Sequence, residues 1–121
     1  MSGPVVVEAD GSPSSRAAVE AAAWEADRHG VDLRLAHGLA WPAGDAFCEG
    51  GAISALRRKY PEVRVRPHRG RTRRALLRAA AAAQLVVVGT YGRRGLPPGS
   101  AGRTLLRHAH CSVAVVPPGR A

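Results

Sequence analysis

Residues 85–103 read LVVVGTYGRRGLPPGSAGR, a short apolar run followed by a basic, glycine-rich loop. The last fifteen of these residues contain five glycines, three arginines and no acid. The apolar run is typical of a strand covered on both faces, as in a parallel sheet. A glycine-rich loop between such a strand and a helix presents backbone N–H groups that can bind phosphate. The same glycines also suit a plain turn, so both interpretations stay open, and no GK[ST] or GxGxxG pattern decides between them.

Outward from this loop, short apolar strands alternate with helical stretches. We expect strands at 5–7, 31–38, 62–68, 85–90 and 112–117, and helices at 13–29, 52–60, 72–84 and 100–108. Such alternation predicts right-handed crossovers and a parallel sheet. Charged and apolar residues alternate over 62–68 (EVRVRPH), which indicates an edge strand. We therefore predict a single α/β domain over residues 1–121, built on a doubly wound five-stranded parallel sheet.

The first helix has clear signals at both ends. Ser12 suits the N-cap and Pro13 the first helical position, since proline has no N–H to leave unpaired there. Gly30 can end the helix in the left-handed conformation. Trp24 lies among alanines in this helix, and we expect it to pack against the core.

Length and composition narrow the class of protein. A chain of 121 residues suits one domain with one core, and two cysteines are too few for a disulfide scaffold. No run approaches the roughly 18 apolar residues of a membrane span. The N-terminus MSGPVVVEAD has no basic region, so we expect no signal peptide and, by default, a cytoplasmic location.

Charge is distributed unevenly along the chain, whose net charge is +9. Residues 1–62 carry nine acids and six bases, whereas residues 63–121 carry twelve arginines and no acid. Arginine suits bidentate contacts with phosphate, so an anionic partner such as a nucleotide or a nucleic acid is one interpretation. Seven arginines fall between Arg64 and Arg78, without the interleaved aromatic residues that stack on bases. Simple solvation of these arginines is the other interpretation.

Catalytic and metal-ligating patterns are missing from the sequence. The five histidines and two cysteines show no zinc-type spacing. His37 ends a strand, where a structural hydrogen bond suits it, and Ser100 has no nucleophile elbow or orienting acid beside it. Cys111 is expected to pack at a strand start. We predict no catalytic residue, no metal requirement and a non-enzymatic role, since no base or metal-ligating acid lies near the loop to support ATP cleavage. Weak ATP cleavage stays open as an alternative.

Two stretches together resemble the universal stress protein family. The first is VVVEADGSPSSRAA at the N-terminus, with an apolar strand, a D-G-S segment and a helix. The second is VVVGTYGRR followed by GSAGRTLLRHAHCSVAVVP, with the family's strand, glycine loop, helix and final strand. The similarity covers nearly the whole chain in the same element order. It implies a flavodoxin-like fold, related to that of adenine-nucleotide alpha-hydrolases, with strand order 3-2-1-4-5.

The resemblance also implies a ligand and a partner. Many members of the family bind ATP, and others bind no nucleotide. In ATP-binding members the Asp after the first strand contacts the base, and backbone at the end of the second strand also lines the base pocket. The glycine loop holds ribose and phosphates. By this correspondence the nucleotide-binding residues are Asp10, Gly38, Gly89, Gly92, Gly99 and Ser100, with Arg93 and Arg94 as candidate phosphate clamps. The family also implies a homodimer through the last strand, residues 112–117.

Two departures from the family pattern bear on this site. Six residues separate Gly92 from Gly99 where the family usually has nine, and Pro97 and Pro98 stiffen the shortened loop. Glu8 stands where the family usually has a small residue, on the same face as Asp10 by the period of a strand. A carboxylate there either crowds the base pocket or pairs with a loop arginine. Binding of ATP, of a smaller phosphate, or of no nucleotide therefore stay open, as do a role through protein partners and a role in nucleic-acid binding.

Overall fold

The computed structural model describes residues 3–8, 13–37, 52–69, 77–78, 80–89 and 111–117. Its strands are β1 (Val5–Glu8), β2 (Leu33–His37), β3 (Val65–Arg69), β4 (Leu85–Gly89) and β5 (Ser112–Val116), and its helices are α1 (Pro13–His29) and α3 (Ala52–Lys59). Residues 77, 78 and 80 are also helical. The five strands fall where the sequence predicts them, within a few residues at each end.

All five strands form one parallel sheet in the order β3-β2-β1-β4-β5. The predicted α/β class, the strand order and the position of β3 at an edge are therefore confirmed. β1 occupies the centre, and Val5, Val6 and Val7 are fully buried there. Burial on both faces explains why the strand is a continuous apolar run.

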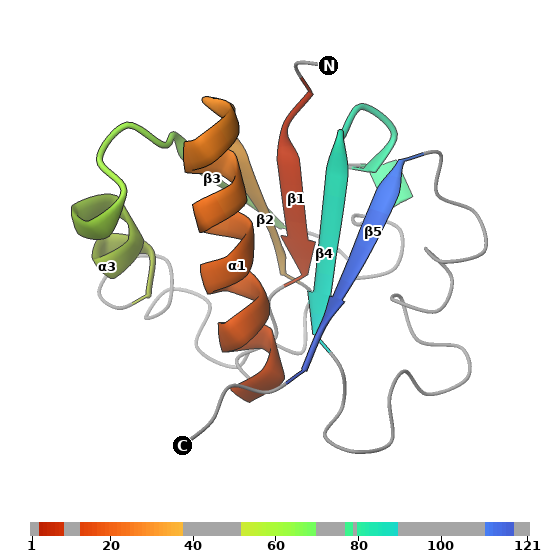
Figure 1. Ribbon diagram of the computed structural model, residues 1–121, viewed down its shortest axis with the longest axis horizontal. Coiled ribbons are helices and arrows are strands. Elements are labelled where there is room, and N and C mark those ends of the chain that lie inside the picture. Colours follow the sequence, from red (N-terminus) through yellow and green to blue (C-terminus); the bar gives the residue numbers. More distant parts are fainter. Residues whose placement is uncertain are drawn as a thin grey trace.

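Each face of the sheet carries its own hydrophobic cluster. Val5 and Val7 point toward α1, and the same cluster includes Leu56 of α3. Val6 points to the other face, where it packs with Ala80 and neighbouring residues of β4. Figure 1 shows α1 lying across one side of the sheet. Because helical residues cover both faces, the sheet is doubly wound, as predicted.

The ends of α1 agree with the sequence signals. The helix begins at Pro13 and ends at His29. Gly30 follows with a φ of 66°, and its N–H donates to the Asp27 carbonyl at 3.2 Å. The Val31 N–H donates to the Ala26 carbonyl at 3.0 Å. These two bonds form a Schellman motif, which satisfies the last carbonyls of the helix.

Two predictions from the sequence are wrong, one about Trp24 and one about the end of the helix expected over 72–84. Trp24 does not pack into the core, because its side chain is 49% exposed on α1. The helix expected over 72–84 does not reach residue 84: helical residues end at Ala80, and residues 81–82 form a turn. The turn allows the Gln84 N–H to donate to the Pro4 carbonyl at 3.0 Å, so a contact distant in sequence sets this boundary.

The two edges of the sheet differ. The Leu33 N–H donates to the Arg64 carbonyl at 2.9 Å, so the backbone groups of Arg64 face β2. Backbone groups of successive strand residues alternate in direction, which turns those of Val65 and Pro67 outward. Arg57 of α3 donates to the Val65 carbonyl at 3.3 Å, and proline has no N–H to offer at position 67. The β3 edge is thus protected against further strand pairing.

The β5 edge has none of these protections among its own residues. Its sequence is SVAVV, without proline or charge, and Val115 is 39% exposed. A short apolar edge strand of this kind is open to pairing with another chain.

Candidate functional site

The carboxyl ends of three neighbouring strands lie at one edge of the sheet, the edge formed by strand ends and not by the outer strands β3 or β5. β1 ends at Glu8, between the ends of its neighbours β2 at His37 and β4 at Gly89. β2 and β3 follow β1 toward one outer strand of the sheet, whereas β4 and β5 lie toward the other. The β1–β4 boundary is therefore the topological switch point, and ligands of open α/β sheets bind beyond the strand ends at such a point.

The structure places some of the predicted site residues and not others. Gly89 is the last residue of β4 and is partly exposed. In the sequence, Gly38 is one residue beyond the end of β2. Asp10 is two residues beyond the end of β1. Outside the described residues lie Asp10, Gly38, Gly92, Arg93, Arg94, Gly99 and Ser100. The ends of β1, β2 and β4, from which the segments of Asp10, Gly38 and the glycine loop continue, thus lie at one edge. The roles of the individual residues stay predictions.

Glu8 is the acidic residue described at this edge. Its side chain is partly buried at the end of β1. The sequence predicts a carboxylate close to Asp10, and the Glu8 carboxylate lies on the strand that leads to Asp10. A negative charge at this position opposes a second negative charge nearby unless a cation lies close to both.

The start of α1 adds positive potential to the same edge. α1 follows β1 within a few residues, and its first turn contains no acidic residue. The N-terminus of a helix carries a partial positive charge and free N–H groups, which favour anions. Arg16, exposed one turn into the helix, adds a full positive charge.

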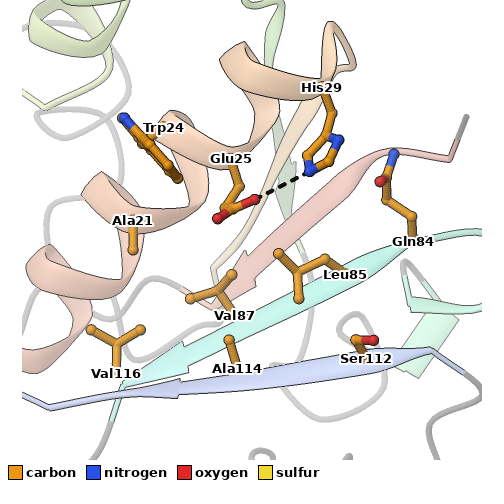
Figure 2. Close-up of a pocket in the computed structure, with 10 residues that line it drawn as sticks. All are labelled: Ala21, Trp24, Glu25, His29, Gln84, Leu85, Val87, Ser112, Ala114 and Val116. Carbon is orange, nitrogen blue, oxygen red and sulfur yellow. Dashed lines mark ion pairs between the residues drawn. The ribbon is translucent and has the colours of Figure 1, made fainter.

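A concave region on the face of the sheet was not predicted from the sequence. It is a hollow of about 520 Å³ between α1 and the strands β4 and β5 (Figure 2). We call it the α1–β5 hollow; its lining is Ala21, Trp24, Glu25, His29, Gln84, Leu85, Val87, Ser112, Ala114 and Val116. The i, i+4 spacing of Glu25 and His29, which form a 3.3 Å ion pair, was the available sequence signal.

Among the titratable groups of the described residues, Cys111 and Lys59 have displaced pKa values. Burial raises the pKa of the Cys111 thiol, which packs beside the cluster around Val6. The position of Cys111 at the start of β5 confirms the predicted packing. A hydrogen bond to Glu20 raises the pKa of Lys59, and the 3.2 Å contact joins α3 to α1.

Neither a metal cluster nor a membrane span is found in the described part of the chain. No three His, Cys, Asp or Glu side chains within the described ranges lie close enough together to hold a metal ion. Among the same residues, no helix has the length and apolarity to cross a bilayer.

Comparison with known proteins gives consistent matches. A sequence profile of the universal stress protein family matches residues 43–117. A universal stress protein of Mycolicibacterium smegmatis is 38% identical over 134 residues, covering 95% of this chain and 46% of the relative. Universal stress protein Rv2623 of Mycobacterium tuberculosis is 34% identical over 131 residues, covering 93% of this chain and 44% of the relative. The chain thus spans a little under half the length of these relatives.

Solved structures show the same fold. A universal stress protein in complex with cAMP is 27% identical, with a TM-score of 0.64, and the match covers 96% of this chain and 98% of the other. A universal stress protein from Archaeoglobus fulgidus has a TM-score of 0.68 at 23% identity, covering 96% and 99% of the two chains. The second likeness supports the flavodoxin-like architecture alone.

Proposed function

Because the chain belongs to the universal stress protein family, we propose that it is a non-enzymatic regulatory module that binds an adenine nucleotide. The nucleotide lies beyond the carboxyl ends of β1 and β4. A cytoplasmic location and a role in the response to stress are parts of the same proposal.

The observation that carries the proposal is the meeting of β1 and β4 at the switch point of the sheet. Gly89 ends β4 there and opens the glycine-rich loop of the sequence. The helix α1 begins at the same edge, and its first turn contains no acidic residue. A relative of the same fold, at 27% identity, is known in complex with cAMP, which supports an adenine nucleotide as the ligand class.

In this proposal, different predicted residues bind the base, the ribose and the phosphate of the nucleotide. Asp10 and the backbone at Gly38 receive the base, and the glycine loop receives ribose and phosphate. Arg93 and Arg94 neutralise the phosphate from the side, as bidentate donors. The loop is three residues shorter than the family pattern, and Pro97 and Pro98 restrict it. We therefore expect a nucleotide with one phosphate to bind more tightly than ATP.

Isothermal titration with AMP, cAMP and ATP tests the proposal. We expect binding of AMP or cAMP at sub-millimolar concentration, and an affinity at least about tenfold lower for Asp10→Ala, since the proposed hydrogen-bond partner of the base is lost. Arg58→Ala, at an exposed position in the last turn of α3, which leads to the amino end of β3, serves as the matched control. Absence of heat with any of the three nucleotides, in a protein shown to be folded, would contradict nucleotide binding.

Assembly into a homodimer through β5 is a second part of the proposal. The open β5 edge and the protected β3 edge support it, because strand pairing is available on one side of the sheet. Sedimentation at micromolar concentration tests it, and a monomer would contradict it.

Nucleic-acid binding is the second candidate function. Arg58 and Arg64 are exposed on α3 and just before β3, and the neighbouring Lys59 and Arg66 are exposed but pair with Glu20 and Asp32. Phosphate contacts of this kind weaken steeply with salt. Retention on immobilised DNA that falls with salt, and that is lost on charge reversal of Arg71, Arg73 and Arg74, would favour this candidate over the first.

A further inference from the structure

Glu8 is an acidic side chain at the end of the central strand of the sheet. β1 lies between β2 and β4, and the carboxyl ends of all three strands lie at the same edge (Figure 1). Val5 and Val7 belong to the hydrophobic cluster beneath α1, whereas Val6 belongs to the cluster on the opposite face. Because side chains alternate along a strand, Glu8 points to the same face as Val6, away from α1.

Two apolar residues of the neighbouring strands flank Glu8. Glu8 pairs with Ala36 of β2 in the parallel register. On the other side, Val7 pairs with Val87 of β4. The next residues of the two strands, Glu8 and Val88, are therefore neighbours. Ala36 and Val88 are 0% and 1% exposed and belong to the cluster on the face away from α1, so the carboxylate lies at the border of an apolar cluster.

The same register places Glu8 close to the start of the glycine-rich loop. Gly89, the last residue of β4, directly follows Val88. A strand spacing of about 4.8 Å and a rise of about 3.3 Å per residue put the Cα atoms of Glu8 and Gly89 roughly 6 Å apart. In the proposed function, the loop that begins at Gly89 binds ribose and phosphate. A phosphate at this loop is therefore close enough to interact electrostatically with the Glu8 carboxylate.

Burial strengthens the electrostatic effect of this carboxylate. Its Oε2 atom is buried, and the side chain of Glu8 as a whole is partly buried. Beside protein groups the effective dielectric constant is about 20, against about 80 in water, so two charges at a given distance interact about four times more strongly. A glutamate is ordinarily ionised at neutral pH. Each further negative charge on a ligand in this site therefore weakens its binding.

An arginine in contact with Glu8 does not reverse this effect. Such an arginine is already paired with a carboxylate, and a phosphate has to compete with that carboxylate for the guanidinium. Ligand groups that donate hydrogen bonds, such as ribose hydroxyls and the amino group of adenine, remain compatible with Glu8, because an ionised carboxylate acts only as an acceptor. The charge at position 8 thus disfavours phosphate and tolerates the nucleoside.

Adenine nucleotides differ in the charge that Glu8 opposes. A cyclic phosphate diester carries about one negative charge, a phosphate monoester carries about two, and a triphosphate carries more. We propose that Glu8 is a specificity-determining residue, whose carboxylate selects adenine nucleotides of low charge against the triphosphate. The inference rests on the proposed nucleotide site, and it adds an electrostatic cause of selection to the steric limit of the short loop.

Isothermal titration with cAMP and with Mg²⁺-free ATP tests the role of Glu8. Glu8→Gln removes the charge at nearly constant volume, and we expect the Kd for ATP to fall about tenfold or more. The Kd for cAMP should change by less than about threefold. Glu62→Gln, at an exposed position before the amino end of β3, is the matched control, because it changes the net charge equally. We expect it to leave both Kd values within about twofold of wild type, since solvent and salt screen the charge at that position.

Two shorter side chains at position 8 separate charge from crowding. Glu8→Asp keeps the charge, and it should retain the wild-type ratio of the two Kd values to within about threefold. Glu8→Ser is small and neutral, and it should bind ATP more tightly, as Glu8→Gln does. An equal gain of ATP binding in Glu8→Asp and Glu8→Ser would assign the selection to size and overturn the inference.

The salt dependence of binding is a second readout, which a purely steric role would not change. The affinity of Glu8→Gln for ATP should fall more steeply with NaCl concentration than that of the wild type, because more net positive charge faces the phosphates. Equal salt dependence in the two proteins would contradict an electrostatic role of Glu8.

Failure of this inference and failure of the proposed nucleotide site give different results. If the wild type binds cAMP and Glu8→Gln leaves the ratio of the Kd values for ATP and cAMP unchanged, selection by Glu8 is overturned and the nucleotide site is retained. Absence of heat with both nucleotides, in folded wild type and folded Glu8→Gln, would contradict the inference and the proposed site together.

Discussion

The side-chain amide of Gln84 donates a 2.6 Å hydrogen bond to the carbonyl of Gly3, across 81 positions of the sequence. The Gln84 backbone N–H adds a bond of 3.0 Å to the Pro4 carbonyl. Together these bonds join the segment before β1 to the segment before β4. They fix the start of the two central strands whose other ends form the candidate nucleotide site.

Gly3→Ala is expected to destabilise this junction. A methyl group at position 3 would overlap the backbone carbonyl of Ala82, which cannot move without disturbing the turn. We expect the free energy of unfolding to fall by about 1–3 kcal/mol, as for other overpacked sites, measured by urea denaturation. Ala81→Ser, at an exposed position of the same turn, should change it by less than about 0.5 kcal/mol. Equal stability of Gly3→Ala and wild type would contradict the close approach.

Gly30→Ala tests the Schellman motif at the end of α1. The φ of 66° is costly for a side chain with a Cβ, and no other atom lies within 4 Å of that Cβ position. The expected loss of about 1–2 kcal/mol is therefore purely conformational. Gly30→Asn should lose less, because asparagine tolerates the left-handed region. Identical thermal unfolding of the Ala and Asn variants would show that φ does not set the cost.

The protection of the β3 edge can be removed. Arg57→Ala with Pro67→Thr frees the Val65 carbonyl and restores an outward N–H at position 67. We expect the double variant to associate beyond the wild-type size, since it now has two open edges. Light scattering after size-exclusion chromatography measures the mass. Arg58→Ala with Pro67 retained is the control, and an unchanged mass for the double variant would argue against edge protection.

Cys111 should react slowly in the folded protein. Burial raises the pKa of its thiol above the ordinary value of 9.0, so less thiolate is present than in the unfolded chain. In a Cys48→Ser background, alkylation by iodoacetamide at pH 8 should be slower in buffer than in urea. Equal rates would contradict the burial of the thiol.

The same displaced pKa has a consequence for stability. The unfolded thiol ionises first, so the free energy of unfolding is unaffected well below pH 9.0 and falls as the pH rises through that value. Cys111→Ala should remove this part of the pH dependence. If the free energy of unfolding of Cys111→Ala falls with pH as steeply as that of the wild type, other groups cause this pH dependence.

The fold was predictable because local patterns and tertiary burial agree. The VVV run at Val5–Val7 is apolar without interruption because both faces are covered. Residues 62–68 alternate because β3 lies at an edge, with Val65 buried and Arg66 exposed. Gly30 ends α1 because it can adopt a positive φ. In each case the sequence signal and the environment have one physical origin.

Two features were not predictable because long-range contacts decide them. The alanines at 79–83 contain no stop signal, and the helix ends at Ala80 because the following residues meet the Gly3–Pro4 segment. Trp24 is a large apolar residue in an alanine-rich helix, and its exposure depends on how far α1 extends over β5. For the candidate site, the positions of the strand ends followed from the fold, whereas the contacts of Asp10 and the loop arginines are outside the described residues.

The location of the bound nucleotide is the most direct test of the proposed function. Two-dimensional ¹⁵N–¹H NMR of the labelled chain, titrated with cAMP, reports on every backbone N–H. We predict the largest saturable shifts at Gly89, at the loop residues 91–100 and at Asp10, beyond the carboxyl ends of β1 and β4. Shifts confined to the α1–β5 hollow, or no saturable shifts in a folded protein, would contradict the proposed site.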